Sequence, residues 1–344
     1  MSGKIDIKSL SQEELGKRIK ALGAEAYRAK QVFRWLYKTG VRSFDDMTDI
    51  PEGLRNKLKS ACHITHPTLL DTRRSALDGT TKYLLKLEDG NTVETVFLPE
   101  SSRSTICLSS QVGCKYACSF CASAPFGFKR NLHASEMIDE VLFVKSANPD
   151  SKITNLVFMG IGEPLDNYDN TLRAIRTFND KDAFYIGARK ITISTCGLIP
   201  GMERLSEEGM QIELSVSLHS ADDAVRSKIV PINKKYPLAD LMEACRRYTE
   251  KTNRIITFEY VLINGVNSSS GDASKLVRLL KGMKCKVNTI AYNQIRSLGF
   301  DPPSDKDVRA FLAILKEGGI NAMHRKSKGE DIDAGCGQLR IARM

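Results

Sequence analysis

Short apolar runs alternate with longer amphipathic segments through most of this chain, from about residue 104 onward. Runs rich in β-branched and aromatic residues predict strands at 105–108, 155–159, 190–195, 213–218, 256–261 and 286–290. Helical spacing of apolar residues predicts helices at 135–147, 167–179, 238–251, 272–283 and 305–317, the first with Ser135 as its N-cap. This alternation predicts an α/β fold with a parallel sheet, either a barrel or an open doubly wound sheet. In both forms, functional residues gather at the C-terminal ends of strands.

The N-terminal part follows a different pattern. Short helices are predicted at 31–38, 44–47 and 54–62, and alternating runs at 82–87 and 92–98 flank the turn signal Glu88-Asp89-Gly90-Asn91. We therefore expect a small helical domain over residues 1–66, a β-hairpin linker over 67–100 and the α/β domain over 101–344.

Charge is unevenly distributed along the chain. The whole sequence has 51 basic and 41 acidic residues, and residues 1–66 hold 13 of the basic and 8 of the acidic ones. A basic helical head is typical of contact with a phosphate backbone, with plain solubility as the alternative. No run approaches the ~18 apolar residues of a membrane span, and the start lacks the apolar core of a signal peptide. We therefore expect a cytoplasmic protein without a membrane partner.

Three of the nine cysteines stand close together after the first strand of the α/β part, as Cys114-x3-Cys118-x2-Cys121. One short loop with this spacing can offer three thiolates to an iron–sulfur cubane and leave the fourth iron open, as in clusters that bind a substrate. Zinc is one alternative, but structural zinc takes four ligands, and the nearest candidate, His133, lies 12 residues past Cys121. Three unrelated cysteines are the other alternative.

Further candidate residues lie in turns or at predicted strand ends. Gly162 allows close backbone approach to a ligand, and Glu163 could hold an ammonium or a ribose hydroxyl. Cys336 lies between two glycines in a polar loop, and Cys107 lies on the first strand. Two such cysteines, if they meet, can form a transient disulfide. The remaining candidates, each also a common turn or cap residue, are Ser194, Ser217, Leu218, His219 and Asn293.

The cysteine spacing resembles that of the radical S-adenosylmethionine superfamily, and MGIGEPL at 159–165 resembles its cofactor-binding turn. Over nearly its whole length the chain resembles one family within it, the dual-specificity RNA methyltransferases, which methylate C2 of adenosine in ribosomal and transfer RNA. The other matching motifs are YRAKQVFRWLY at 27–37, FDDMTDIP at 44–51, VETVFLPE at 93–100, CLSSQVGCKYACSFCASAPFGFKRNL at 107–132, ISTCGLIP at 193–200, SLHSADDAVRSKIVPINKKYP at 217–237 and GEDIDAGCGQL at 329–339.

The resemblance implies a partial (β/α)6 barrel with an N-terminal helical RNA-binding domain. It implies a [4Fe–4S] cluster on Cys114, Cys118 and Cys121, and two molecules of S-adenosylmethionine consumed per turnover. The implied cofactor contacts are Gly162, Glu163, Ser194, Ser217, Leu218, His219 and Asn293. Cys336 would carry the methyl group, Glu94 would accept the C2 proton, and Cys107 would release the product by forming a disulfide with Cys336.

By the same resemblance, the substrates are 23S ribosomal RNA, in its peptidyl-transferase region, and a subset of transfer RNAs, at the adenosine 3′ to the anticodon. The electron donor would be a flavodoxin or a ferredoxin, and the protein would be a monomer. In the basic head, we expect Tyr27 and Phe33 to be core residues.

The chain departs from the family pattern at Gly335, where Ala is usual and where we expect a looser loop, and within residues 291–303. Two other functions remain possible at this point. One is methylation at adenosine C8, as in antibiotic-resistance relatives that share these cysteines. The other is an iron–sulfur protein that binds RNA without catalysis.

Overall fold

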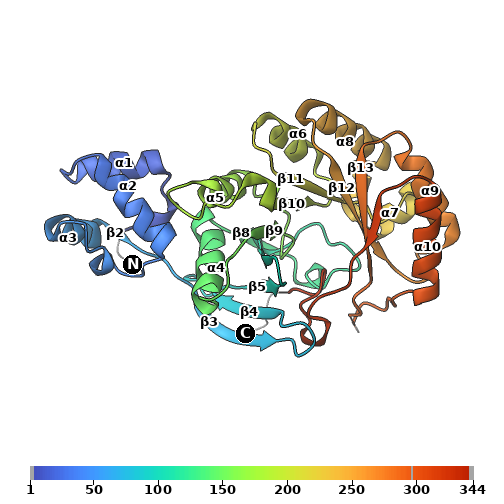
Figure 1. Ribbon diagram of the computed structural model, residues 1–344, viewed down its shortest axis with the longest axis horizontal. Coiled ribbons are helices and arrows are strands. Elements are labelled where there is room, and N and C mark those ends of the chain that lie inside the picture. The colour runs from blue at the N-terminus through green and yellow to red at the C-terminus, as the bar shows by residue number, and fades with distance from the viewer. Residues whose placement is uncertain (1–3, 296, 341–344) are drawn as a thin grey trace.

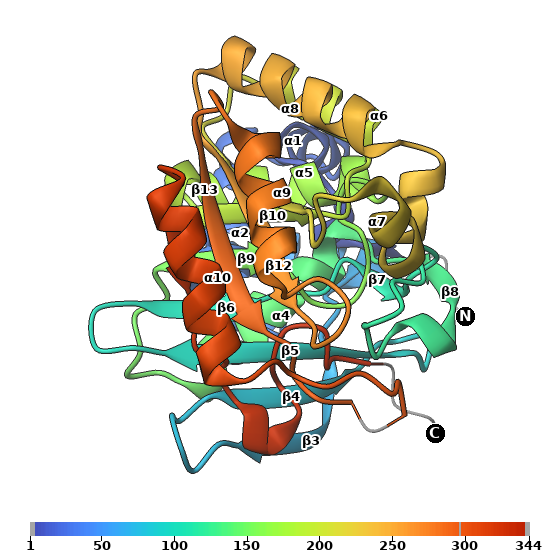
Figure 2. The same cartoon turned by 90° about the vertical axis from the view of Figure 1, so that its right-hand side faces the viewer.

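One ten-stranded sheet forms the centre of the molecule, in the order β14-β13-β12-β11-β10-β9-β6-β5-β4-β3. The computed structural model describes residues 4–295 and 297–340. Within this sheet, β6 and β9 to β14 are parallel to one another. The strands β3, β4 and β5 pair antiparallel and continue the sheet past β6. The sheet curves, and helices cover its outer side (Figure 1, Figure 2).

All six predicted strands of the α/β part are present, each within one residue of the predicted bounds. They are β6 (Ser104–Cys107), β9 (Asn155–Phe158), β10 (Ile191–Thr195), β11 (Glu213–Ser217), β12 (Ile256–Leu262) and β13 (Cys285–Ala291). Their alternating or continuous apolar residues face the core; in β10, Ile191 and Ile193 are buried. A short parallel strand, β14 (Ala322–His324), pairs with β13 and was not predicted. The predicted partial barrel of parallel strands is therefore confirmed.

Seven helices of the described chain follow these strands: α4 (Ala134–Ala147), α5 (Tyr168–Asn179), α6 (Ile199–Glu207), α7 (Asp223–Ile229), α8 (Leu238–Thr252), α9 (Ser270–Leu280) and α10 (Asp305–Glu317). The five predicted helices are among them, and the short α6 and α7 were not predicted. The prediction of Ser135 as an N-cap was wrong, because His133 occupies that position. The Glu136 carboxylate accepts a hydrogen bond from the His133 backbone N–H at 2.8 Å, so the helix starts before Ser135, which is buried.

The predicted hairpin is confirmed as β4 (Thr81–Lys86) and β5 (Thr92–Pro99). Its turn is closed by a hydrogen bond of 2.8 Å from Leu87 N to Asn91 O. A third strand, β3 (Thr68–Arg74), pairs with β4 on one side, and β5 pairs with β6 on the other. The segment 67–100 is thus an antiparallel extension of the main sheet and brings Glu94 next to the barrel.

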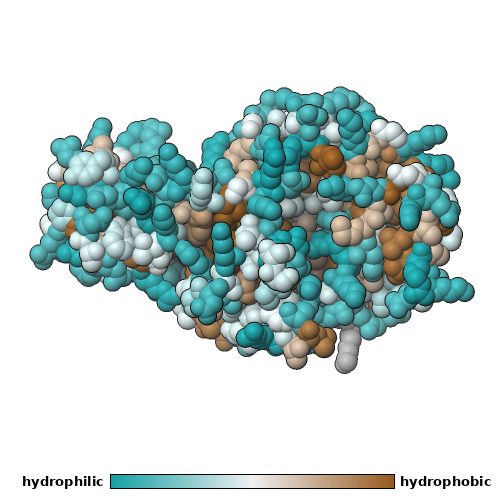
Figure 3. All heavy atoms as spheres, viewed as in Figure 1, coloured by the Kyte–Doolittle hydropathy of each residue, from teal (hydrophilic) through white to brown (hydrophobic). Residues whose placement is uncertain are grey.

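The N-terminal helices form a lobe beside the barrel, and its surface in Figure 3 is mostly hydrophilic. The lobe consists of α1 (Gln12–Ala21), α2 (Tyr27–Arg34), a π-helical turn over Trp35–Thr39, a 3-10 turn over Phe44–Asp46 and α3 (Glu52–Ala61), with β1 (Ile5–Asp6) paired to β2 (Cys62–His63). Phe33 is buried in the core as predicted. The same prediction for Tyr27 was wrong, since its side chain is 57% exposed at the start of α2 and the Arg28 guanidinium covers its ring.

A buried polar contact joins the lobe to the barrel. Lys8 forms an ion pair with Asp139 of α4 and donates a hydrogen bond to Thr65 O. The Thr65 hydroxyl also donates to Asp139, at 3.1 Å. Lys8 and Asp139 are 3% and 4% exposed, so this contact lies inside the molecule. In the part of the chain that the structure describes, no helix is both long and apolar enough to span a bilayer.

Candidate active site

The carboxyl ends of the parallel strands surround one cavity, as expected for this class of fold. Its wall also includes residues of the C-terminal loop, which closes it from the side of the antiparallel strands. Of the residues predicted from sequence, the cavity brings together Cys114, Cys118, Cys121, Gly162, Glu163, Ser194, Ser217, His219 and Cys336. Leu218, Asn293, Cys107 and Glu94 lie in positions next to it that are described below.

The three clustered cysteines lie in the loop between β7 (Gln111–Gly113) and β8 (Phe128–Asn131), two short antiparallel strands. Backbone hydrogen bonds define the loop, from Cys114 N to Gly127 O at 2.9 Å and from Cys121 N to Cys118 O at 3.0 Å. Ala117 has a φ of +49°, which lets the chain reverse between the first two cysteines. The loop therefore turns all three cysteines toward the cavity.

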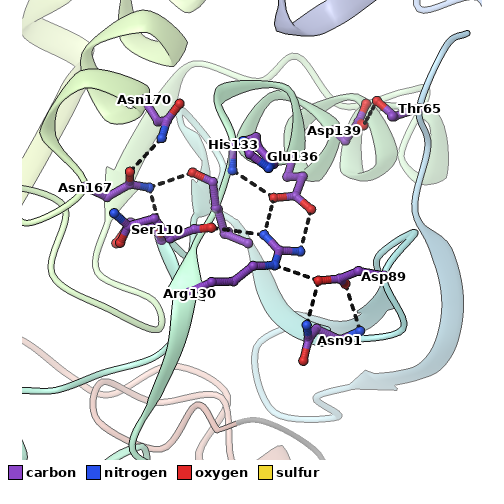
Figure 4. A network of polar contacts seen from close by, with 12 residues as sticks. Thr65, Asp89, Asn91, Ser110, Arg130, His133, Glu136, Asp139, Asn167 and Asn170 are labelled. Carbon is purple, nitrogen blue, oxygen red and sulfur yellow. Dashed lines mark hydrogen bonds and ion pairs between the residues drawn. The ribbon is translucent and has the colours of Figure 1, made fainter. Parts of the chain in front are cut away.

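A polar network holds the base of this loop in place (Figure 4). Arg130 of β8 donates two hydrogen bonds to the Glu136 carboxylate, at 2.7 and 2.8 Å, and one to Asp89 of the hairpin turn at 2.6 Å. Asn167 Nδ2 donates to the carbonyls of Ser110 and Leu132 at 2.8 and 2.7 Å. Since bidentate arginine–carboxylate pairs fix orientation, this network connects β8 to both α4 and the hairpin.

The cysteine triad has the chemistry that an iron–sulfur cluster requires. Burial raises the pKa of the Cys114 thiol to about 12 and raises those of Cys118 and Cys121 as well. Such thiols become thiolates when a metal supplies positive charge. Three sulfurs line one cavity, which fits a multi-iron cluster with one open iron, whereas structural zinc takes four protein ligands.

The glycine turn after β9 approaches the cysteine segment closely. A Cβ on Gly160 would lie 2.6 Å from Leu108 O, and one on Gly162 would lie 2.5 Å from Gln111 Cβ. Gly162 also has a φ of +105°, which side-chain-bearing residues rarely adopt. The turn presents Glu163, whose carboxylate accepts hydrogen bonds from Cys196 N at 2.7 Å and Leu165 N at 3.0 Å. Burial raises the pKa of Glu163, and the Cys196 N–H opposes that effect.

At the next two strand ends, Ser194 and Ser217 line the cavity together with His219. The His219 Nδ1 accepts a hydrogen bond of 3.0 Å from Val261 N, which leaves the ring proton on Nε2. Burial lowers the pKa of His219 to about 3, so the ring is neutral. Leu218 differs from its neighbours because its side chain is buried in the main apolar core, leaving only its backbone near the site.

Cys336 enters the cavity from the C-terminal loop, between Gly335 and Gly337. Asn293, after β13, holds this loop, since its Nδ2 donates to Cys336 O at 3.1 Å and its Oδ1 accepts from the Ser327 hydroxyl. A Cβ on Gly335 would lie 2.6 Å from Asn293 Nδ2 and 2.9 Å from Gln338 Oε1. The expectation that Gly335 loosens the loop was therefore wrong, because glycine here permits close packing by Asn293.

Cys107 and Cys336 line a second, smaller cavity behind the main one, together with Met159 and Arg325. Cys107 is buried on β6, Cys336 is solvent-accessible, and both thiols are free. Burial raises the pKa of the Cys107 thiol, and desolvation of the sulfur raises that of Cys336 although the residue as a whole is exposed. The positive charge of Arg325 opposes both increases. Arg325 also pairs with Glu259 at 3.6 Å.

Glu94, on β5, lines a separate cavity on the other side of the C-terminal loop. It is 7% exposed, pairs with Lys82 at 3.2 Å and accepts a hydrogen bond of 2.8 Å from Arg340 N. Lys82 in turn donates to Asp333 O at 2.8 Å. Burial raises the pKa of Glu94, and Lys82 is the main group that opposes this. A glutamate on a hairpin strand normally faces solvent, but Glu94 does not, because residues of the C-terminal loop cover it.

Three residues of the site had no role assigned from sequence: Cys196 and Arg325, which line the main cavity, and Arg226, which is fully buried against it. Cys196 and Arg226 lie within motifs that carried the resemblance, ISTCGLIP and SLHSADDAVRSKIVPINKKYP. Motif membership was the only available signal, because an arginine in a helix normally faces solvent.

Comparisons with known proteins align nearly the whole chain with relatives. Residues 5–64 match the family model for the ribosomal RNA large subunit methyltransferase N-terminal domain, and residues 108–277 match that for the radical SAM superfamily. The chain is 45% identical, over 97% of both sequences, to a probable dual-specificity RNA methyltransferase RlmN of Thermoanaerobacter sp. (strain X514). A protein of the same name from Clostridioides difficile (strain 630) is 43% identical, over 98% of each.

One solved structure matches the chain with a comparable sequence identity and over a comparable share of its length. The crystal structure of a radical SAM methyltransferase from Sphaerobacter thermophilus is 42% identical and covers 97% of this chain and 99% of its own, with a TM-score of 0.93. The similarity thus includes the lobe, the antiparallel extension and the barrel together.

Proposed function

Since the chain belongs to the dual-specificity RNA methyltransferase family, we propose that it methylates C2 of adenosine through a methyl group carried on Cys336. Its activity is RNA methylation by radical S-adenosylmethionine chemistry, with a [4Fe–4S] cluster and S-adenosylmethionine as cofactors. We propose as substrates the peptidyl-transferase region of 23S ribosomal RNA and the adenosine 3′ to the anticodon in a subset of transfer RNAs. The observation that carries the proposal is that Cys336 and the triad share one cavity.

Cys114, Cys118 and Cys121 would hold the cluster, and Glu163, Ser194, Ser217 and His219 would bind S-adenosylmethionine beside it. When bound, these cofactors supply the one-electron chemistry that adenine C2 requires, because this ring carbon lies between two nitrogens and is a poor nucleophile. The neutral His219 ring offers an N–H donor, and the buried Glu163 carboxylate suits an ammonium group. These contacts would orient the cofactor and exclude water from it.

Cys336 would hold the methyl group as a thioether before its transfer. Arg325 supports this role, because its charge favours the thiolate that attacks a sulfonium methyl group. Asn293 would keep the Cys336 backbone in place through its hydrogen bond to Cys336 O. For Asn293 this is a positioning role and differs from the cofactor contact that the resemblance implies.

Release of the product would use Glu94 and Cys107. Glu94 would take the C2 proton of the RNA adduct, and the Cys107 thiolate would attack the Cys336 sulfur. The new S–S bond would replace the bond from sulfur to the product carbon. That carbon would keep the electron pair and take up a proton, which completes the methyl group. A thiol reductant then restores both cysteines. The shared small cavity supports the meeting of the two sulfurs.

The basic N-terminal lobe would contact the phosphate backbone of the RNA, in line with its excess of Lys and Arg. We propose a flavodoxin or ferredoxin as the electron donor, a monomeric enzyme and action in the cytoplasm, where these RNAs are found. The division into a helical RNA-binding domain (1–66), a hairpin segment (67–100) and a catalytic barrel (101–344) is part of this proposal.

Nucleoside mass spectrometry of 23S ribosomal and transfer RNA, with and without the protein, tests the function. We expect 2-methyladenosine in both RNA classes, and 8-methyladenosine without it would overturn the C2 assignment. Cys336→Ala should lower methylation by more than 100-fold while the bound iron stays unchanged. The control is Cys285→Ala. Cys285 begins β13, at the opposite end of that strand from Asn293, and this variant should keep full activity.

A further inference from the structure

Arg226 of α7 is a fully buried arginine at the ends of two barrel strands. Its Nε donates to Leu218 O at 3.1 Å, and one terminal nitrogen donates to Cys196 O at 2.8 Å and Ser217 O at 3.1 Å. The other terminal nitrogen donates to Asn233 Oδ1 at 2.6 Å. All four acceptors are neutral oxygens, so they solvate the guanidinium without cancelling its charge.

No ion pair within residues 4–295 and 297–340 includes Arg226. The nearest carboxylate along its hydrogen bonds is Asp223, which Asn233 Nδ2 contacts at 2.9 Å, at the exposed start of α7. Burial of a cation without a counter-ion is unfavourable by several kcal/mol. The position therefore calls for an anionic group close by.

The cysteine loop is the neighbour that can supply this charge. Ser119 N donates to Ile229 O at 3.0 Å, which attaches the loop to the end of α7. Cys118 and Cys196 pack on the apolar cluster of Ile229, Val230 and Ile232. Cys196, whose backbone O accepts a hydrogen bond from Arg226, lines the same cavity as Cys118. A [4Fe–4S] cluster on three thiolates carries about one negative charge when oxidised and about two when reduced.

We infer that Arg226 is the buried counter-charge of the iron–sulfur cluster, which stabilises the reduced cluster more than the oxidised one and so raises its reduction potential. This inference rests on the proposed attachment of the cluster to Cys114, Cys118 and Cys121. Arg226 is a positioning residue that tunes the reduction potential of the cluster. Its N–H groups donate to protein oxygens, so it acts on the cluster through its charge alone.

A redox titration followed by electron paramagnetic resonance tests this on the reconstituted protein. At the wild-type midpoint, Arg226→Gln should lower the ratio of reduced to oxidised cluster at least about tenfold, or about 59 mV for a one-electron couple. Arg226→Lys keeps the charge. It should shift the logarithm of this ratio by less than about a third of the shift expected for Arg226→Gln. Arg246→Gln, an exposed arginine on α8, should leave it unchanged.

Iron content and thermal unfolding, before and after cluster reconstitution, distinguish charge from packing. The increase in Tm on reconstitution should shrink or vanish in Arg226→Gln and persist in Arg226→Lys. An unchanged potential in Arg226→Gln, or equal loss of the cluster in both variants, would overturn the inference. Cluster binding by a variant with alanine at all three triad cysteines would instead refute the proposed attachment itself.

Discussion

At the scale of single residues, the Glu94 carboxyl and the Cys107 thiol both have displaced pKa values, which bear on the roles proposed for them. Glu94 is buried, which raises its pKa, yet Lys82 and the Arg340 N–H keep the ionised form accessible. Cys107 is a buried thiol with a raised pKa. A carboxylate with a raised pKa is a stronger base than an exposed one, which suits the removal of a ring proton.

Lys82→Met should move the acid limb of the pH profile of the product-release rate to higher pH. The base form of Glu94 is needed, so release rises with pH through its raised pKa and levels off above it. Without Lys82, that pKa rises further, and on the acid side the release rate should fall about tenfold, the lower end of the effect of a close opposite charge. Pre-steady-state release rates between pH 5 and 9 measure this. Lys86→Met, exposed on the same strand, should keep the wild-type limb; a matching shift there would contradict the assignment.

Cys107→Ala should trap the RNA on the protein. Methyl transfer still forms the bond from Cys336 to the product carbon, but no second sulfur is present to break it. We expect a covalent adduct, sensitive to ribonuclease, on denaturing gels, and a turnover lowered by more than 100-fold. The double variant with Cys336→Ala should form no adduct. Free RNA as the sole species in Cys107→Ala would contradict the role of Cys107 in release.

Sequence was informative at this scale wherever chemistry depends on local spacing. Cys114, Cys118 and Cys121 lie in one loop, so their spacing alone indicates a cluster. Arg226 and Arg325 gave no such signal, because the burial of Arg226 and the place of Arg325 on the cavity wall depend on segments distant in sequence. For Glu94, residue type and strand position predicted exposure, and only the packing of the C-terminal loop reverses this.

At the scale of elements, the turn between β9 and α5 is the most tightly constrained part of the site. Gly162 combines a positive φ with contact to Gln111, whose side chain donates to Asn131 and Asp166 at 2.9 Å and accepts from Glu163 N. One side chain thus connects the glycine turn, β8 and the start of α5. A displacement of Gln111 should therefore affect the position of Glu163.

Gly162→Ala should weaken S-adenosylmethionine binding by more than tenfold and destabilise the fold by about 1–3 kcal/mol through overpacking. Gly90→Ala is the matched control, since Gly90 also has a positive φ but no atom within 4 Å of an added Cβ. It should lower stability by about 1–2 kcal/mol, from conformational strain, and leave cofactor binding intact. Equilibrium dialysis and urea unfolding measure both effects. Equal losses of binding in the two variants would show that close packing at Gly162 is unimportant.

The elements predicted correctly are those with strong periodicity, including six barrel strands and the five longer barrel helices. Among the missed elements, α7 has 7 residues and β14 has 3, too few for a clear pattern. The 10-residue α1 and the 7-residue β3 were also missed. The N-cap of α4 was misplaced because Glu136 bonds to His133, a residue type outside the usual capping set.

At the scale of the whole molecule, the contact of Lys8 with Asp139 is one buried connection between the lobe and the barrel. Both side chains are buried, and the Thr65 hydroxyl completes the contact from the end of the lobe. Sequence predicted the two regions and their order. It could not predict this contact, because Lys8 and Asp139 are 131 residues apart and each would normally be solvated.

Lys8→Met should destabilise the protein by about 3–5 kcal/mol, because it leaves the Asp139 carboxyl buried without its partner. Addition of Asp139→Leu should recover part of this loss, since it removes the unpaired group. Lys17→Met breaks an exposed ion pair with Glu13 and should leave stability nearly unchanged. Urea unfolding followed by circular dichroism measures all three, and additive losses in the double variant would exclude a coupled pair.

The loop of the triad and the loop of Cys336 are hydrogen-bonded to each other. Ala122 N donates to Gly337 O at 2.7 Å, and the Ser123 hydroxyl donates to Leu339 O at 2.7 Å. The two loops are therefore held as one packed unit. The proposed cluster ligands and the proposed methyl carrier would share this support, so a substitution that displaces one loop would also displace the other.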